Sequence, residues 1–369
     1  MRSDTSAKTI LLSAGGTGGH LFPAESLAAE LIRRGYVVEL ATDERADKYG
    51  RRFPARAIHI IASATLKGRS PSAILATGAA LARGFVQSWR LMHRLKPAVV
   101  VGFGGYPTVP PLSAAVLAHV PTVLHEQNAV MGRANARLAR RVTRIATSFA
   151  EVRMPAGLAG KVDFTGNPVR DMVIEAAALP YPDLEADGPF NLIVTGGSQG
   201  ARYFSDAVPP AIALLDADLR ARLRLTQQVR PEDMDRVKAA YAAIDVAAEL
   251  SSFFVDLPAR IAASHLVIGR AGASTVTELA IIGRPGLLVP LPGALDQDQA
   301  ANARVLETVG GGWSHAQKDL TPEVLAAEIS RLMRAPQMLI AAAVAARSVG
   351  RPDAVARLAD VVERAAKGG

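Results

Sequence analysis

The sequence predicts an α/β protein with two doubly wound, Rossmann-like domains of parallel strands and a cleft between them. Three observations support this prediction. Short apolar segments alternate with segments of helical periodicity. Glycine-rich turns join such a segment to a helix near residue 15 and again near residue 196. The chain has 369 residues, enough for two domains. Strands that alternate with helices form parallel sheets covered on both faces.

In the first half, seven apolar segments have the length of strands. They are residues 8–14, 36–42, 57–61, 98–102, 121–125, 143–147 and 161–165. We expect a first domain over residues 1–166, with a linker near Gly166-Asn167-Pro168. A last helix within residues 353–369 is expected to return to this domain.

In the second half, residues 190–195 repeat the opening arrangement of strand, glycine turn and helix. Further strands are expected at residues 222–228, 251–255, 265–268 and 286–290. These elements predict a second domain over residues 167–352.

The composition is that of a globular protein, with 49% apolar and 21% charged residues. The absence of cysteine excludes disulfides and thiolate metal sites. No apolar run approaches the ~18 residues of a spanning helix. Residues 1–166 hold 22 Lys and Arg against 10 Asp and Glu, whereas residues 167–369 hold 20 against 24. The basic first half predicts an anionic partner, such as a phosphorylated substrate, an anionic lipid or a nucleic acid.

The first glycine turn reads GGTGGH at residues 15–20. Glycines at the start of a helix allow a ligand to approach free amides, and the helix dipole there favours a phosphate. A tight turn without a ligand is the simpler alternative. The turn lacks the lysine of a P-loop. It also has Leu21 in place of the last glycine of a dinucleotide fingerprint, although Asp43 could supply the ribose acid.

A second candidate phosphate site follows the expected strand at residues 265–268. Its run GRAGASTVTE at residues 269–278 opens another helix with small and hydroxyl residues. Glu278, one helical turn in, could accept both hydroxyls of a ribose. Gln299 and Asn302 are three residues apart on one helix face, and their amides suit sugar hydroxyls. A nucleoside diphosphate sugar would use all these groups.

Seven ordered motifs extend over most of the chain. They are GGTGGH at 15–20, GFGGYPT at 102–108, LHEQN at 124–128, GNPVR at 166–170, GGSQGAR at 196–202, RAGAST at 270–275 and QAANA at 299–303. Together they resemble the MurG family within glycosyltransferase family 28. This family transfers N-acetylglucosamine onto an undecaprenyl-diphosphate-linked muramyl-pentapeptide on the cytoplasmic face of the bacterial membrane.

The resemblance implies the two-domain GT-B fold, UDP-N-acetylglucosamine as donor and no cofactor. It places the donor diphosphate on Ser198 and the helix start, the ribose on Glu278, the uracil near Phe254 and Val255, and the sugar on Gln299 and Asn302. The full set of implied donor and substrate contacts is Thr17, Gly18, Gly19, Asn128, Arg170, Ser198, Val255, Ala273, Ser274, Thr275, Val276, Glu278, Gln299 and Asn302.

The resemblance also implies a site for the acceptor diphosphate on the glycine turns of the first domain. Its residues are Gly15, Gly16, Gly104, Gly105 and Tyr106. A single inverting displacement requires a base for the attacking hydroxyl. His20 is the candidate because an imidazole titrates near neutral pH. Glu126 is the alternative base, and a capping or anion-contacting role is the alternative for His20.

The pattern of residues 66–96 predicts a contact with the membrane that holds the lipid-linked acceptor. Ile74, Leu81, Phe85 and Trp89 recur at helical spacing, and basic residues surround them. Such a helix suits adsorption to anionic lipid as a peripheral protein. The alternative is an ordinary amphipathic helix that packs against the sheet.

Three further alternatives concern chemistry and partners. Asp296 and Asp298 have the spacing of a metal-binding Asp-x-Asp pair, but we expect them to cap the following helix and expect no protein-bound metal. Only 5% of residues are aromatic, and no aromatic residues are interleaved on the strands, so nucleic acid is not expected as a partner. A GT-B glycosyltransferase that acts on another lipid or small-molecule acceptor is the nearest alternative function.

Overall fold

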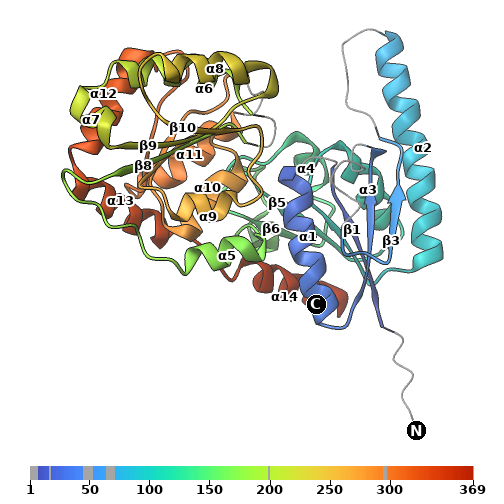
Figure 1. The fold of residues 1–369 in the computed structure, drawn as a ribbon. Coiled ribbons are helices and arrows are strands. Elements are labelled where there is room, and N and C mark those ends of the chain that lie inside the picture. Colours follow the sequence, from blue (N-terminus) through green and yellow to red (C-terminus); the bar gives the residue numbers. More distant parts are fainter. Residues whose placement is uncertain are drawn as a thin grey trace. The chain divides into compact units, whose positions relative to one another are not determined.

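The computed structural model describes residues 7–15, 18–44, 53–63, 71–197, 200–293 and 297–368. The chain forms two compact units (Figure 1). One unit consists of Met1–Arg170 with Pro352–Gly369, and the other of Asp171–Arg351. The change of unit thus falls just beyond the expected linker.

The first unit contains a sheet of seven parallel strands in the order β3-β2-β1-β4-β5-β6-β7. The strands are short and almost continuously apolar, as expected where both faces of a parallel sheet are covered. Their bounds are β1 (Thr9–Ser13), β2 (Val37–Thr42), β3 (Ala57–Ile60), β4 (Val99–Gly102), β5 (Thr122–Glu126), β6 (Arg144–Thr147) and β7 (Val162–Phe164).

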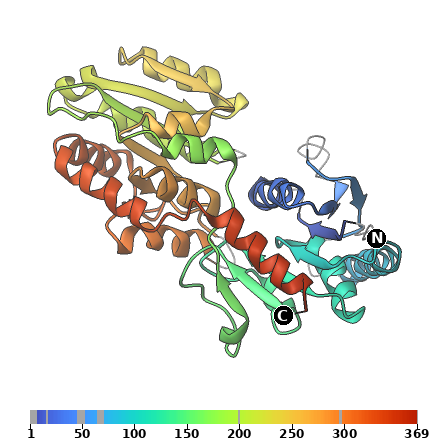
Figure 2. The ribbon, with the colours of Figure 1, turned by 90° about the horizontal axis from the view of Figure 1, so that it is seen from below.

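Helices cover both faces of this sheet. Ile10 and Leu12 share one core with Leu358, and Leu11 lies in the opposite core with Leu112, because successive strand residues point to opposite faces. The first core is covered by α1 (Gly18–Arg33) and α14 (Ala354–Ala366), which pack side by side (Figures 1 and 2). The second core is covered by α2 (Pro71–Leu95), α3 (Val109–Leu117) and α4 (Arg133–Leu138).

The second unit contains six parallel strands in the order β10-β9-β8-β11-β12-β13. Their bounds are β8 (Phe190–Thr195), β9 (Leu223–Gln228), β10 (Ala248–Ser251), β11 (Leu266–Gly269), β12 (Gly286–Leu288) and β13 (Gly312–Ser314). The helices are α5 (Asp171–Ala177), α6 (Arg202–Ala213), α7 (Ala217–Arg222), α8 (Met234–Ala242), α9 (Leu257–Ala262), α10 (Ala273–Ile282), α11 (Asp298–Thr308), α12 (Pro322–Met333) and α13 (Pro336–Ser348).

Both sheets reverse their strand order at the same relative place. In the first unit β1 lies between β2 and β4, and in the second β8 lies between β9 and β11. Ligands of doubly wound sheets bind at the carboxyl ends of the strands beside such a reversal. We therefore expect ligands to bind at the turns after β1 and β4, and at those after β8 and β11.

Two expectations about strands in the second unit were wrong. The strand expected at residues 251–255 is β10, which ends at Ser251. The apolar run that suggested it, which includes Phe253 and Val255, instead forms an exposed connection to α9. Strand β13 was missed, because its three residues Gly312–Ser314 are too short to show periodicity.

Candidate active site

In the first unit, His20 lies between two glycine turns at the reversal point. A methyl group on Gly15 would lie 3.5 Å from Nδ1 of His20 and 3.7 Å from the carbonyl oxygen of Gly104. A methyl group on Gly105 would lie 3.6 Å from Cε1 of the same ring. The partly exposed imidazole at the start of α1 is thus bordered by bare backbone from both turns. The predicted residues Gly16 and Thr17 lie outside the described residues.

The turn after β4 has a backbone that requires glycine. Gly104 and Gly105 have φ angles of 85° and 78°, a region that side chains disfavour. A short 3₁₀ helix, Tyr106–Thr108, follows at once and leads into α3. Backbone can therefore approach a ligand here, as the acceptor-diphosphate prediction requires, and Tyr106 is half-buried beside it.

A buried histidine, His125, lies on β5, the strand that pairs with β4. His125 at the end of β5 is fully buried, and its Nε2 lies 3.2 Å from the carbonyl oxygen of Gly166. Nε2 of Gln127 donates to Nδ1 of the same ring at 3.0 Å. The ring therefore carries its proton on Nε2, which donates to Gly166. Burial lowers the pKa of His125 to about 4, although the bond to Gly166 opposes this effect.

Glu126 is a buried carboxylate with several internal partners. Its oxygens accept from the backbone amides of Asn128 and Gly132 at 3.0 Å each, and from Nδ2 of Asn135 at 2.7 Å. Burial raises the pKa of Glu126, and these hydrogen bonds oppose the rise. Asn135 also lies against Gly104, because a methyl group there would be 3.3 Å from its Nδ2. This geometry favours Glu126 as an anchor of the turn that carries Asn128, and favours His20 as the base.

Arg170, the last residue before the second unit, returns to α1. Its guanidinium lies 4.6 Å from the centre of the Phe22 ring, which itself covers Gly18. Partial burial raises the pKa of Glu25, while the charge of Arg170 lowers it. The implied donor contacts of Asn128, Arg170 and the exposed Gly19 stay predictions.

In the second unit, Gln228 shapes the glycine turn after β8. Its Oε1 accepts from Thr195 Oγ1 at 3.1 Å and from the amide of Gly196 at 3.0 Å. The amide of Gly197 donates to Thr195 Oγ1 at 3.3 Å. The first two amides of the turn are therefore already used within the protein. Ser198, the residue predicted to meet the diphosphate, lies outside the described residues.

The start of α10 lies next to this turn, because β8 and β11 are hydrogen-bonded neighbours. A methyl group on Gly269 would lie 3.2 Å from Cγ2 of Thr195 and 3.9 Å from Cγ2 of Thr275. Among the described residues, no side chain caps this helix at Gly272. The first-turn amides of an α-helix lack partners within the helix, and here they remain available to an anion. The predicted residues Ala273, Ser274 and Thr275 form this first turn.

The remaining predicted donor residues differ in exposure. Glu278 is half-buried one turn into α10, and the side chain of Val276 is fully buried, so only its backbone could meet a ligand. Val255 is 73% exposed after β10, beside the buried Phe254. Phe254 stacks with the guanidinium of Arg260, 4.6 Å from its ring centre.

The two amides predicted to meet the sugar have different surroundings. Gln299 is half-buried and accepts from the amide of Leu291 at 3.0 Å. Asn302 is fully buried and donates to the carbonyl oxygen of Ala271 at 3.1 Å. A direct sugar contact of either residue stays a prediction, but the burial of Asn302 favours a role in holding the RAGAST turn.

Asp298 is not the cap residue of α11, contrary to the expectation for the Asp-x-Asp pair. The cap residue is Gln297, with φ 50° and ψ 33°, and Asp298 is the first helical residue. Asp296 lies outside the described residues. In the part of the chain that the structure describes, no three His, Cys, Asp or Glu side chains are grouped so that they could hold a metal ion.

Three of the side chains of α2 predicted to contact the membrane, those of Leu81, Phe85 and Trp89, are partly buried. Phe85 and Trp89 stack on one another and pack partly against the core beneath α2, and Leu81 is half-buried. The side chain of Ile74 lies outside what the structure describes. The exposed apolar side chains of α2 include Leu75 at 75% and Val86 at 47%. None of the described helices combines the length and apolar character that crossing a bilayer requires.

Sequence reasoning missed three supporting side chains, those of Gln127, Asn135 and Gln228. Gln228 could have been found, because it is a polar residue at the end of a predicted strand beside the reversal point. Asn135 gave no such signal, since only the fold brings it beneath Gly104.

Comparisons with known proteins agree with this architecture. The model of the glycosyltransferase family 28 N-terminal domain matches residues 10–147, and that of the C-terminal domain matches residues 191–358. The chain is 57% identical over 361 residues to a protein of Chelativorans sp. (strain BNC1) named UDP-N-acetylglucosamine–N-acetylmuramyl-(pentapeptide) pyrophosphoryl-undecaprenol N-acetylglucosamine transferase, covering 98% of this chain and 96% of the relative. A protein of the same name from Rhodopseudomonas palustris (strain ATCC BAA-98 / CGA009) is 56% identical over 98% of this chain and 100% of its own length.

A solved structure extends the similarity to three dimensions. The crystal structure of Acinetobacter baumannii MurG superposes with a TM-score of 0.78 at 30% identity and covers 97% of this chain and 99% of that one. The fold is therefore GT-B, as the resemblance implied. On this evidence the chain belongs to glycosyltransferase family 28.

Proposed function

We propose that this protein transfers N-acetylglucosamine from UDP-N-acetylglucosamine to the 4-hydroxyl of an undecaprenyl-diphosphate-linked muramyl-pentapeptide, with inversion at the anomeric carbon. The observation that carries the proposal is the match, over 98% of the chain, to relatives named for this transfer. The geometry supports it, because each unit places bare backbone or a helix start at its reversal point, where a diphosphate binds best.

The second unit binds the donor. The uncapped first turn of α10 holds the diphosphate, with hydroxyls from Ser274 and Thr275. Glu278, one turn further, accepts from the ribose hydroxyls, and the connection at Phe254-Val255 frames the uracil. Asn302 holds the RAGAST turn through Ala271.

The first unit binds the acceptor. The turns around Gly15 and Gly104-Gly105 hold its diphosphate, and His20 between them takes the proton of the attacking hydroxyl. The hydroxyl oxygen forms a bond to the anomeric carbon as the bond from that carbon to the UDP oxygen breaks. UDP departs with the electron pair, and the N-terminus of α10 stabilises its negative charge. The proton on His20 is then released to water.

The protein binds the membrane peripherally through α2. Leu75 and Val86 are exposed apolar side chains on this helix, and Arg83 and Arg90 are exposed beside them. An apolar face with cationic neighbours adsorbs to anionic lipid. The lipid-linked acceptor makes the cytoplasmic membrane surface the expected location.

The decisive experiment is the transfer of labelled sugar from UDP-N-acetylglucosamine to a short-chain analogue of the lipid acceptor. The expected product is a β-linked disaccharide, formed together with one UDP. Transfer to other lipid or small-molecule acceptors, with none to the muramyl lipid, would replace the proposal by another family 28 activity.

A further inference from the structure

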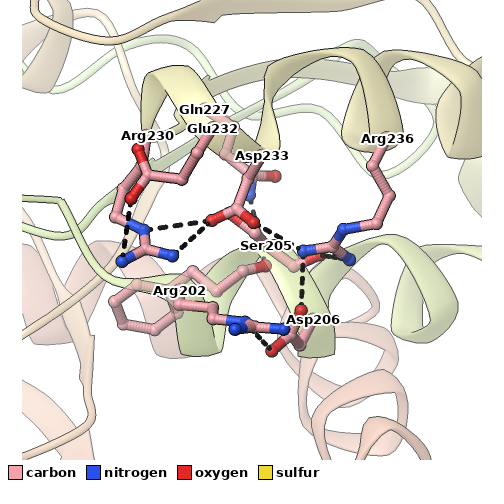
Figure 3. A network of polar contacts seen from close by, with 9 residues as sticks. Arg202, Ser205, Asp206, Gln227, Arg230, Glu232, Asp233 and Arg236 are labelled. Carbon is pink, nitrogen blue, oxygen red and sulfur yellow. Dashed lines mark hydrogen bonds and ion pairs between the residues drawn. The ribbon is translucent and has the colours of Figure 1, made fainter.

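Arginine side chains are paired with carboxylates on two connections at the carboxyl edge of the second sheet. The connection after β9 carries a network centred on Asp233, which accepts from Arg230 and from Arg236 at 3.0 Å each (Figure 3). This network joins α6 to the segment after β9, and none of its described hydrogen bonds or ion pairs involves residues 252–256. The connection after β10 depends on a different arginine, Arg260 on α9.

The connection between β10 and α9, residues 252–256, contains the residues proposed to frame the uracil. Phe253 and Val255 are exposed, whereas Phe254 between them is buried. Strand β10 is the outermost strand of the sheet, so it pairs with β9 alone. The connection therefore has a neighbouring strand on one side only, and side-chain contacts must hold the rest of it.

The first half of this connection is held by hydrogen bonds of two serines. Oγ of Ser251 donates to the carbonyl oxygen of Phe253 at 2.8 Å. The carbonyl oxygen of Ser252 accepts from Nε2 of Gln228 at 3.2 Å. These bonds fix the connection as far as Phe253, and Arg260 contacts the part beyond it.

Arg260 holds this second half at three points along the chain. Its Nε donates to Asp256 at 2.8 Å, and its Nη1 donates to Glu249 on β10 at 2.6 Å. The face of the guanidinium covers the ring of Phe254, 4.6 Å from the ring centre. The two carboxylates lie on either side of Phe254 in the sequence. One planar, rigid group thus joins the strand, the ring and the start of the helix.

These contacts act locally and contribute little to the stability of the whole unit. The side chains of Glu249 and Asp256 are 55% and 49% exposed, and exposed ion pairs and cation–π contacts add little to the free energy of unfolding. The hydrogen bond from Arg260 lowers the pKa of Asp256, so this pair stays charged at neutral pH. Its effect is therefore to restrict the backbone around Phe254.

We propose that Arg260 is a positioning residue that fixes the backbone at Phe254-Val255 in the conformation that receives the uracil of the donor. The inference rests on the proposed function, because it assumes that the base of a nucleotide sugar binds at this connection. A segment held in its bound conformation loses less conformational entropy on binding. Arg260 therefore contributes to the affinity for the base and leaves the diphosphate contacts at α10 unchanged.

The test compares Arg260→Met with the matched control Arg331→Met. Arg331 also pairs with a carboxylate, that of Glu328 at 2.6 Å, and lies 5.5 Å from the centre of the Trp313 ring. Trp313 belongs to β13, at the opposite edge of the sheet. We expect Arg260→Met to raise the Kd for UDP, measured by calorimetry, and the KM for UDP-N-acetylglucosamine about 5- to 10-fold, a range that corresponds to ~1–1.4 kcal/mol. The kcat and the KM for the acceptor analogue stay within about twofold, and Arg331→Met changes every constant by less than about twofold.

Two further probes separate the base from the diphosphate. Ribose 5-diphosphate lacks the base, so we expect its Kd, measured by competition with UDP, to stay within about twofold in Arg260→Met. CDP carries an amino group where UDP carries a carbonyl oxygen, and we expect the wild type to prefer UDP. In Arg260→Met this preference is expected to fall about 3- to 10-fold. A general loss of structure would instead weaken all three ligands alike.

A double-variant cycle tests whether Arg260 acts through the ring of Phe254. In a Phe254→Leu background, Arg260→Met is expected to weaken UDP binding by less than about twofold, because the ring that the guanidinium holds is already absent. Asp256→Asn, which weakens the bond to Nε, is expected to raise the Kd for UDP about 3- to 5-fold. If Arg260→Met does not fold, as judged by circular dichroism, Asp256→Asn and its ratio of UDP to CDP affinity decide the question.

The inference is overturned if Arg260→Met leaves the Kd for UDP within about twofold, or if UDP and ribose 5-diphosphate lose affinity equally. Additive effects in the cycle would also overturn it. Failure of the proposed function looks different, because the wild-type protein would then neither bind UDP nor transfer the sugar.

Discussion

The imidazole of His125 donates from Nε2 to the carbonyl oxygen of Gly166, 41 residues further along the chain. This bond joins the end of β5 to the segment that leads to Arg170, and Gln127 fixes the ring from its other nitrogen. The arrangement requires a neutral ring, so it has a direct consequence for stability at low pH.

We expect stability to fall as the pH falls from about 6.5 to about 4, because burial lowers the pKa of His125 to about 4. Over this interval the unfolded chain binds the proton and the folded chain does not. The loss approaches about 3 kcal/mol, since one pKa unit corresponds to ~1.36 kcal/mol. Urea unfolding of the wild type and of His125→Gln, measured at pH 7 and pH 4.5, checks this. The glutamine variant can still donate to Gly166 but does not titrate, so an equal pH dependence of both proteins would contradict the assignment.

His20→Ala is expected to lower kcat by about 10²- to 10⁴-fold, the usual contribution of a general base. UDP-sugar binding stays within about twofold, because most of the predicted donor contacts lie in the other unit. Single-turnover kinetics and calorimetry measure the two effects separately. A near-normal kcat would show that His20 is not the general base.

The variant Glu126→Gln tests whether Glu126 is the general base or a structural anchor of the turn that carries Asn128. The glutamine amide cannot accept from all the donors that face Glu126, so the free energy of unfolding should fall by about 1–3 kcal/mol. We expect a lower melting temperature, with kcat reduced far less than in His20→Ala. A stable variant with kcat as low as that of His20→Ala would instead make Glu126 the base.

Arg284→Met is expected to destabilise the second unit by about 3 kcal/mol or more. Arg284 is 1% exposed and donates to the carbonyl oxygens of Ala262, Ile282, Gly283 and Pro180. Burial lowers its pKa to about 10, so it remains charged at neutral pH, and the C-terminal ends of α9 and α10 stabilise that charge. Removing it leaves several buried carbonyls without a donor. Thermal unfolding measures the loss, and a change below about 1 kcal/mol would contradict this account.

Membrane adsorption should depend on the exposed face of α2. Leu75→Ser with Val86→Ser is expected to weaken binding to anionic vesicles about 3- to 10-fold at an unchanged melting temperature. Phe85→Ser with Trp89→Ser should chiefly lower the melting temperature, because these rings pack on the core. Vesicle co-sedimentation measures the adsorption of each double variant, and calorimetry measures its melting temperature. Unchanged adsorption after Leu75→Ser and Val86→Ser would place the membrane contact elsewhere.

Transfer should persist in a chelator, because the start of α10 can stabilise the leaving diphosphate. The labelled-sugar assay with excess EDTA checks this expectation. Loss of activity in EDTA that magnesium restores would contradict it.

The sequence was a good guide to elements that repeat a simple pattern. Apolar runs such as Ile10–Leu12 predicted strands within about two residues, since a covered parallel strand is apolar on both faces. The prediction failed at Phe253-Phe254-Val255, an equally apolar run that forms a connection in which Phe253 and Val255 are exposed and Phe254 is buried. Local composition cannot tell a buried strand from a partly exposed connection.

Site residues were predictable where they lie on the motifs and not where they support them. The glycines follow strands, and His20 and Glu278 lie near the starts of the helices that come next, so their place at a sheet edge can be inferred. Asn135 lies on another element, and only the fold brings it to the turn at Gly104. Phe85 and Trp89 pack partly on the core, which fits the alternative of a helix that packs against the sheet, and their membrane contact stays a prediction because helical spacing does not say which face of α2 meets the sheet.

The return of α14 to the first unit has a consequence for how the chain acquires its structure during synthesis. Leu358 and Val362 complete a core that begins with Ile10, so the first unit is completed by residues made after the second unit. Helix α14 must leave the ribosome before that core can close, whereas the inserted second unit, Asp171–Arg351, is complete earlier. A truncation that removes only the final helix would therefore expose apolar surface under α1, at the far end of the sequence from the cut.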